Sequence, residues 1–140
     1  MGLTLTLTLA SLIGAIAALH LSWAFGADWP APKGEPLAIY VTPGRRRPGR
    51  AITLAVAAAI AAAALVVLLA RASVPAPWDR LAALAYFVVT LVFLGRGLVG
   101  YFPALWRHAE GLPFHRLNRA FYSPLCLAIG AGLAINILIR

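Results

Sequence analysis

The chain has 140 residues, of which 62% are hydrophobic and only 11% are charged. A soluble domain carries roughly a quarter of its residues as charged side chains, so this composition excludes a soluble protein and indicates that lipid is the solvent. The net charge is +8, but the basic residues cluster in short gaps between apolar runs, as in membrane proteins, and we expect no nucleic-acid partner. The length accommodates one domain, and we expect residues 1–140 to form a single integral membrane domain.

Four apolar runs each approach the roughly 20 residues that a helix needs to cross the hydrocarbon core. Such a run has to be helical in lipid, because its backbone groups find no water there. The Thr-Leu alternation from Leu3 to Leu9 has the period of a strand, but by the same argument it belongs to the outer turns of the first helix. We therefore predict an all-α fold, a four-transmembrane-helix antiparallel bundle. The helices are expected over about residues 3–25, 51–70, 81–102 and 118–139.

Two structures are open for the fourth helix, because Pro124 lies inside its run. In the first, Ser123 and Pro124 cap a short helix, which would span only about 24 Å of a core about 30 Å thick. In the second, the helix begins near Asn118 and kinks near Pro124, which lacks the N–H that the preceding turn would bind. We favour the kinked helix.

The distribution of Lys and Arg orients the bundle. The first and third loops hold eight of these residues (Lys33, Arg45, Arg46, Arg47, Arg50, Arg107, Arg116 and Arg119), and the opposite side holds three (Arg71, Arg80 and Arg140). The positive-inside rule then places loops one and three in the cytoplasm and both termini outside. Eleven Arg against a single Lys is typical of a GC-rich bacterial genome, so we expect the protein in the bacterial cytoplasmic (inner) membrane.

Small residues recur at positions where helices can pack closely. They follow a spacing of four along the first helix (Ala10, Gly14, Ala18, Ser22 and Gly26), and further pairs occur in the third (Gly97, Gly100) and fourth (Ala128, Gly132). Small residues allow a close approach in lipid, where no hydrophobic effect drives helices together. We favour packing within one chain over a dimer interface.

Polar residues inside the apolar runs gather at one membrane face. His20 and Trp23 share a helix face near the end of the first run, and Arg96 lies at a similar depth in the third. The start of the fourth run supplies three more on one face, at i, i+4 and i+8: Asn118, Tyr122 and Cys126. Because the helices alternate in direction, all of these side chains are expected at the face of the long first and third loops.

Arg96 needs an acceptor, because an unpaired cation in hydrocarbon costs several kcal/mol, and no Asp or Glu lies within the four runs. The candidates are Asp28 at the rim, carbonyls freed near Pro124, Tyr122, Asn118, a water or an anionic ligand. His20 is a candidate general base, hydrogen-bond partner or axial ligand of a haem or chlorin. The spacing of His108, Glu110 and His115 matches no compact site, so we predict no metal centre. The cofactor stays unknown.

The strings LHLSWAFGADWP at 19–30 and LNRAFYSPLCLAIG at 117–130 resemble a family of small bacterial four-helix integral membrane proteins that is known only as a domain of unknown function. The likeness covers the plan of the whole chain. It implies a shared site without naming a reaction: His20, Trp23, Arg96, Tyr122, Ser123 and Pro124. Family members often carry Asp where this chain has Asn118, which speaks against a fixed Asp–Arg or Asp–His pair.

Two functional hypotheses remain. In the first, a polar pocket near one membrane face, between the first, third and fourth helices, binds a small amphipathic or lipid-like ligand, with His20 carrying any catalytic chemistry. Its ligand-binding residues would be His20, Trp23, Asp28, Arg96, Asn118, Tyr122 and Ser123. In the second, the protein is an accessory subunit of a larger membrane complex, or a homo-oligomer, and His20 ligates a haem or chlorin. Membrane lipid is a partner in both hypotheses.

Overall fold

The computed structural model describes residues 2–70 and 75–139, and over these ranges the regular secondary structure is all helical, with no strand. Arg71 and Arg140, which entered the charge count, lie outside the described residues. The elements in chain order are α1 (Gly2–Ala24), α2 (Ala38–Val41), α3 (Arg50–Leu69), α4 (Trp78–Val99), the 3₁₀ segment η1 (Pro103–Ala109), α5 (Pro113–Leu117), the π-helical turn η2 (Asn118–Tyr122) and α6 (Ser123–Leu138).

Four helical segments are long and apolar enough to cross a membrane: Gly2–Ala24, Arg50–Leu69, Trp78–Val99 and Pro113–Leu138. The predicted four-helix membrane fold is therefore confirmed, and the Thr-Leu alternation from Leu3 to Leu9 is helical as expected. Large apolar side chains remain exposed along all four segments, among them Leu7, Leu65, Val92 and Leu138. Such surfaces are compatible with a hydrocarbon environment and not with water.

The third and fourth segments differ from the predicted bounds. The third ends at Val99 and not at Phe102, because the chain turns at Gly100 and continues from Pro103 as a 3₁₀ helix. The fourth begins at Pro113, five residues before the predicted start at Asn118. His115 and Arg116 make this first turn too polar to be recognised from hydropathy.

A π-helical turn lies where the kink was predicted. The backbone N–H of Ser123 donates to the carbonyl of Asn118, five residues earlier, just before Pro124. A proline has no N–H to continue the regular α-helical pattern, and π-turns often occur inside helices at functional positions. The helix therefore continues through Asn118 to Tyr122, as expected for a helix that begins before Ser123. The kink of its axis near Pro124 stays a prediction.

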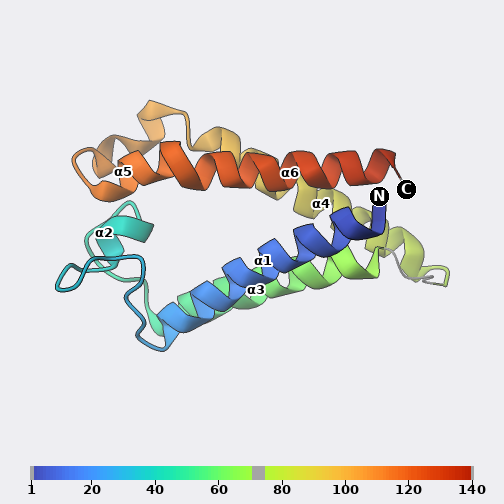
Figure 1. Cartoon of the computed structure of the whole chain (residues 1–140), viewed down its shortest axis with the longest axis horizontal. Coiled ribbons are helices and arrows are strands. Elements are labelled where there is room, and N and C mark those ends of the chain that lie inside the picture. Colours follow the sequence, from blue (N-terminus) through green and yellow to red (C-terminus); the bar gives the residue numbers. More distant parts are fainter. Residues whose placement is uncertain (1, 71–74, 140) are drawn as a thin grey trace.

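The helices form two pairs that diverge from one end of the molecule. α1 packs along α3, and α4 packs along α6. The pairs meet at the end where the chain begins and ends, and they separate toward the opposite end, where α2 and α5 lie (Figure 1). The first loop thus folds back as α2 against α5, and it bridges the separated ends of the two pairs.

Glycines allow α4 and α6 to approach closely. A Cβ at Gly97 would lie 2.9 Å from the backbone nitrogen of Leu127, and a Cβ at Gly130 would lie 2.9 Å from that of Leu94. At Gly132 a Cβ would meet the Leu9 side chain of α1 at 2.9 Å. These three glycines therefore lie at close contacts between helices of the chain. Gly14, by contrast, has nothing within 4 Å of its Cβ position.

A buried polar cluster joins α1, α4 and α6 at the end where the pairs meet. The Asn136 amide donates to the hydroxyl oxygens of Thr6 and Tyr86, at 3.1 Å each. Those hydroxyls in turn donate to the carbonyls of Gly2 (2.8 Å) and Leu133 (3.2 Å). We call Thr6, Tyr86 and Asn136 the polar clamp. Its members satisfy one another in the core, where an unpaired polar group would be costly.

Thr6→Val should lower the free energy of unfolding by about 1 kcal/mol, because hydrogen bonds between membrane helices contribute roughly 0.6–1.7 kcal/mol. The matched control is Thr8→Val, since Thr8 is exposed and its hydroxyl donates only to Thr4 within its own helix. Thermal unfolding in a mild detergent measures both variants. Equal midpoints for the two would contradict an energetic role for the polar clamp.

Candidate functional site

Arg96 lies close to the end of α4. It is four residues before Gly100, which corresponds to about 6 Å along the helix axis at 1.5 Å per residue. Its Nη2 donates to Oδ1 of Asn118 at 2.8 Å. Asn118 is 1% exposed, and its Nδ2 donates to the carbonyl of Gly100 at 3.3 Å. The hydroxyl of Ser123, which is fully buried, donates to the same Oδ1 at 3.4 Å. Asn118 is therefore the acceptor that Arg96 required, and it fixes one side of the guanidinium.

The other terminal nitrogen of Arg96 is not satisfied by the protein. Nη1 is buried, and among the described residues no acceptor lies within hydrogen-bond distance of it. The guanidinium also lies over the ring of Trp106, with 5.6 Å between Cζ and the ring centroid. An aromatic face attracts a cation but does not replace a hydrogen-bond acceptor. Arg96 thus retains unused donors next to a cavity.

That cavity, which we call the Arg96 cavity, lies between α1, α4 and the start of α6 and has a volume of about 220 Å³. It is lined by Ile16, Leu19, His20, Trp23, Val41, Arg96, Phe121, Tyr122, Leu125 and Cys126. Five of the residues that were expected to converge from the three helices therefore line one space: His20, Trp23, Arg96, Tyr122 and Cys126. Asn118 and Ser123 lie behind Arg96 and hold it in place.

His20 has one ring nitrogen engaged and one available. Nδ1 lies 2.8 Å from the carbonyl of Ile16, one turn earlier. Because a carbonyl only accepts, Nδ1 carries the proton, and in the neutral ring Nε2 presents a lone pair. The ring stacks at a tilt on Trp23, with 4.7 Å between the centroids. The indole N–H of Trp23 is used, since it donates to the carbonyl of Trp29 at 2.6 Å.

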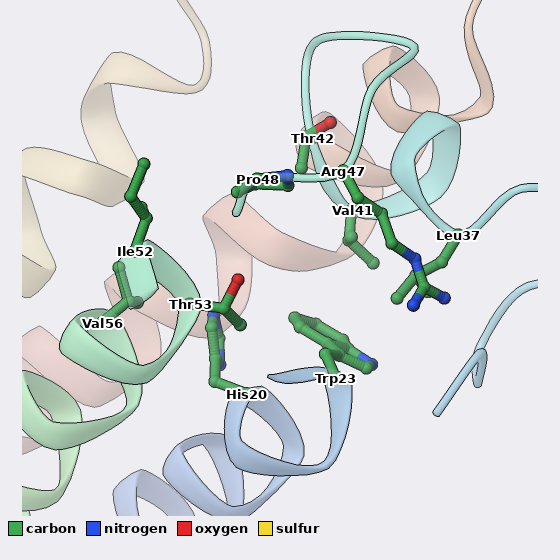
Figure 2. Close-up of a pocket in the computed structure, with 10 residues that line it drawn as sticks. All are labelled: His20, Trp23, Leu37, Val41, Thr42, Arg47, Pro48, Ile52, Thr53 and Val56. Carbon is green, nitrogen blue, oxygen red and sulfur yellow. The ribbon is translucent and has the colours of Figure 1, made fainter. Parts of the chain in front are cut away.

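His20 and Trp23 also line a second cavity, of about 160 Å³, which we call the loop cavity. Figure 2 shows the two rings rising from the end of α1 toward the first loop, with Thr53 of α3 beside His20. The remaining lining residues are Leu37, Val41, Thr42, Arg47, Pro48, Ile52 and Val56. His20 and Trp23 therefore form a wall that the two cavities share.

Asp28 lies apart from the Arg96 cavity. Its carboxylate forms an ion pair with Arg47, which also donates to the carbonyl of Ala27. This contact ties the first loop to itself at an exposed rim. Asp28 is thus not the acceptor of Arg96. Arg47, the cation that lines the loop cavity, already has Asp28 as its counter-ion.

Two contributions to the site lie outside the sequence prediction. The hydroxyl of Tyr122 donates to the carbonyl of Tyr40 at 2.9 Å, so the fourth segment is tied to the first loop just before α2 ends. Leu37 and Ala38 are buried beside it. The apolar stretch around Tyr40 was the available signal, but it is too short to be told from an ordinary loop. The second contribution is Trp106, whose ring lies under the Arg96 guanidinium. Its place in the third loop gave no indication of this contact.

The fold and the site together define a four-helix integral membrane protein with a cavity beside Arg96, near the end that carries its long loops. Residues 13–133 match the family described as protein of unknown function (DUF3995), and the chain belongs to this family, as the resemblance predicted. No curated protein and no solved structure matches the chain.

Proposed function

We propose that the protein binds a small amphipathic, lipid-like molecule in the Arg96 cavity and holds its anionic or strongly polar head at Arg96. The observation that carries this proposal is the buried Nη1 of Arg96, whose donors meet no acceptor among the described residues. A buried cation is stable only when its hydrogen bonds are satisfied. A ligand head in the adjoining cavity supplies that acceptor.

The neighbouring polar groups have separate roles in this proposal. Nε2 of His20 accepts a hydrogen bond from a water beside the head, or from a head that carries an O–H or N–H, since Nδ1 is fixed on Ile16. The hydroxyl of Tyr122 donates a hydrogen bond to the carbonyl of Tyr40, so its oxygen accepts from the same kinds of donor. Trp23 and Leu19 supply apolar walls. If the ligand is also a substrate, His20 is the general base within reach.

The membrane orientation belongs to the same proposal. We place the protein in the bacterial cytoplasmic membrane, with loops one and three and the nearby Arg96 cavity at the cytoplasmic face. The count of basic residues in those loops supports this orientation. His20 and Arg96 lie about one helical turn before the ends of α1 and α4, which would put them close to the depth of the lipid headgroups. The ligand would therefore enter from the inner leaflet.

The test is the identity of amphiphiles that remain with the purified protein. Protein isolated in a mild detergent is extracted, and the extract is analysed by mass spectrometry. We expect an amphiphile that is depleted at least about tenfold in Arg96→Gln, because hydrogen bonds to a charged group contribute roughly 1.5–3 kcal/mol. Arg47→Gln is the matched control, since Arg47 is paired with Asp28 and should retain the wild-type amount.

Cys126→Leu provides a variant that keeps the charge of Arg96 and narrows the cavity that Cys126 lines. It should also lose the amphiphile while remaining folded. Equal amounts in wild type, Arg96→Gln and Cys126→Leu would refute the proposal, and so would purified wild type that holds no amphiphile.

A second candidate is a haem or chlorin ligated by His20. One observation favours it: a His whose Nδ1 is held by a backbone carbonyl and whose Nε2 is open has the arrangement of many metal-ligating histidines. The two cavities beside His20, about 160 and 220 Å³, are each smaller than the roughly 300–1,000 Å³ of usual ligand pockets. A Soret or chlorin absorption band of the purified protein, lost in His20→Ala, would establish this candidate.

A further inference from the structure

An apolar groove continues from the Arg96 cavity along the surface between α1 and α6. We call it the α1–α6 groove; it has a volume of about 430 Å³ and is lined by Leu12, Ala15, Ile16, Leu19, Trp29 and Leu125. Three of these residues, Ile16, Leu19 and Leu125, also line the Arg96 cavity. The two spaces are therefore adjacent: the Arg96 cavity lies near the helix ends, and the groove reaches from Trp29 of the first loop to Leu12 near the middle of α1.

The groove has the direction of a lipid chain. From His20 to Leu12 the groove-facing side of α1 extends eight residues toward the centre of the span, about 12 Å at 1.5 Å per residue. The indole of Trp29 is the single polar group among its lining residues. A ligand whose head lies at Arg96 can thus place an alkyl chain in the groove, parallel to the surrounding lipid.

The single positive charge at the cavity limits the negative charge that the ligand's head group can carry. Arg96 is the single Lys or Arg among the lining residues of the Arg96 cavity. One of its terminal nitrogens is held by Asn118, so Nη1 remains for the ligand. A phosphate monoester carries about −1.5 to −2 charges near neutral pH, and one cation would leave part of that charge unpaired in a buried site. A single negative charge matches a single guanidinium.

The shape of the site limits the number of chains. A phosphodiester lipid also has one charge, but it carries substituents on both sides of the phosphate and two acyl chains. The Arg96 cavity, at about 220 Å³, holds a small terminal head. Two apolar spaces adjoin it: the α1–α6 groove, and a space of about 360 Å³ at the loop end, lined largely by residues of the first loop and the start of the fourth segment. Of these two, the groove is the one that extends along α1 toward the middle of the span, so one alkyl chain can follow the surrounding lipid. A carboxylate at the end of one alkyl chain fits both limits, because its head is terminal, planar and suited to a guanidinium.

We propose that the ligand is a long-chain carboxylate, with its head at Arg96 and its chain in the α1–α6 groove. This inference rests on the proposed function and narrows it to one chemical class. The same chemistry occurs in a free fatty acid and in other single-chain acids. The required features are one terminal carboxylate and one unbranched apolar chain.

The experiment uses bromine atoms on the ligand chain to quench tryptophan fluorescence of the full-length protein in detergent. Trp29 lines the groove and Trp23 lines the adjacent cavity, so a chain in the groove quenches both. The three probes are a mid-chain brominated fatty acid, the corresponding brominated fatty alcohol and phosphatidylglycerol with brominated chains. We expect saturable quenching by the acid at a Kd about tenfold or more below those of the other two probes.

Ala15→Phe fills the groove and should weaken binding of the acid by about tenfold or more, whereas Ala58→Phe, on an exposed position of α3, should leave it unchanged. Equal Kd values for acid and alcohol, tighter binding of phosphatidylglycerol, or no effect of Ala15→Phe would each overturn the carboxylate inference. The proposed function would still stand if Arg96→Gln depletes a co-purified amphiphile of another class. It would fall separately if that depletion is absent.

Discussion

Replacing Gly97 with Ala should destabilise the protein by about 1–3 kcal/mol, which is the usual cost of overfilling a packed interior. The added Cβ would lie 2.9 Å from the backbone nitrogen of Leu127 and closer still to its side chain. A side chain can rotate away, but the backbone of α6 can yield only if α4 and α6 separate. That separation would also move Asn118 relative to Arg96, because the two residues lie on these neighbouring segments.

Gly95→Ala is the matched control for this prediction. Gly95 lies two residues away in the same helix, and its Cβ position has nothing within 4 Å. The substitution there should be neutral or stabilising by up to about 1 kcal/mol, since Ala favours a helix over Gly by that amount. Thermal unfolding in detergent compares the two variants. Similar midpoints would show that α4 and α6 do not pack through Gly97.

Asn118→Asp should weaken ligand binding by about 10- to 100-fold while the protein stays folded with a lower unfolding midpoint, because its second carboxylate oxygen cannot donate to the Gly100 carbonyl as Nδ2 does. The Oδ1 that now accepts from Arg96 at 2.8 Å would belong to a carboxylate, and the guanidinium would acquire a permanent counter-ion. A ligand anion at Nη1 would then gain much less binding free energy from Arg96, whose charge is already compensated. Hydrogen bonds to a charged group contribute roughly 1.5–3 kcal/mol. The measurement is the Kd of the brominated fatty acid together with the unfolding midpoint.

A contrasting variant, Asn118→Leu, removes both contacts of this side chain and tests its contribution to stability. It removes the acceptor of Arg96 and the donor to the Gly100 carbonyl, so it should lower the unfolding midpoint. If Asn118→Asp binds the acid as tightly as wild type, the charge of Arg96 is not what holds the ligand. Asn118 would then be purely structural.

The four membrane-crossing segments could be predicted because hydrocarbon permits few alternatives to a helix. Run length alone placed α1 and α3 to within one residue at each end. The early start at Pro113 escaped prediction because hydropathy does not register a turn that carries His115 and Arg116. α2 could not be predicted because its four residues are too few to show a helical periodicity. Contacts with the rest of the fold hold it in place.

The candidate site was predicted from two quantities: the depth of each polar residue in its apolar run, and the alternating direction of the helices. Those two quantities bring His20, Trp23, Arg96 and Tyr122 to one cavity, and they do so without any contact being known. They cannot say which acceptor Arg96 selects, because that depends on side-chain direction across α4 and the π-helical turn. Asp28 illustrates this, since it lies at an exposed rim and pairs with Arg47 instead.

The polar clamp lies at the end of the molecule opposite the polar residues that were expected at one membrane face. Thr6 and Asn136 lie near opposite ends of the sequence and satisfy each other in the core. Each was visible as a polar residue in an apolar run, but nothing in the sequence pairs them. Their pairing holds the two helix pairs together at the end opposite the Arg96 cavity.

Native mass spectrometry of the full-length protein, released from a mild detergent, tests the central claim most directly. It reports the mass of any bound molecule and the number of chains in the same spectrum. Wild type should carry one single-chain amphiphile per chain, and Arg96→Gln should appear as the bare chain. Bare wild-type chains, or the same adduct at the same occupancy in Arg96→Gln, would contradict a ligand held at Arg96.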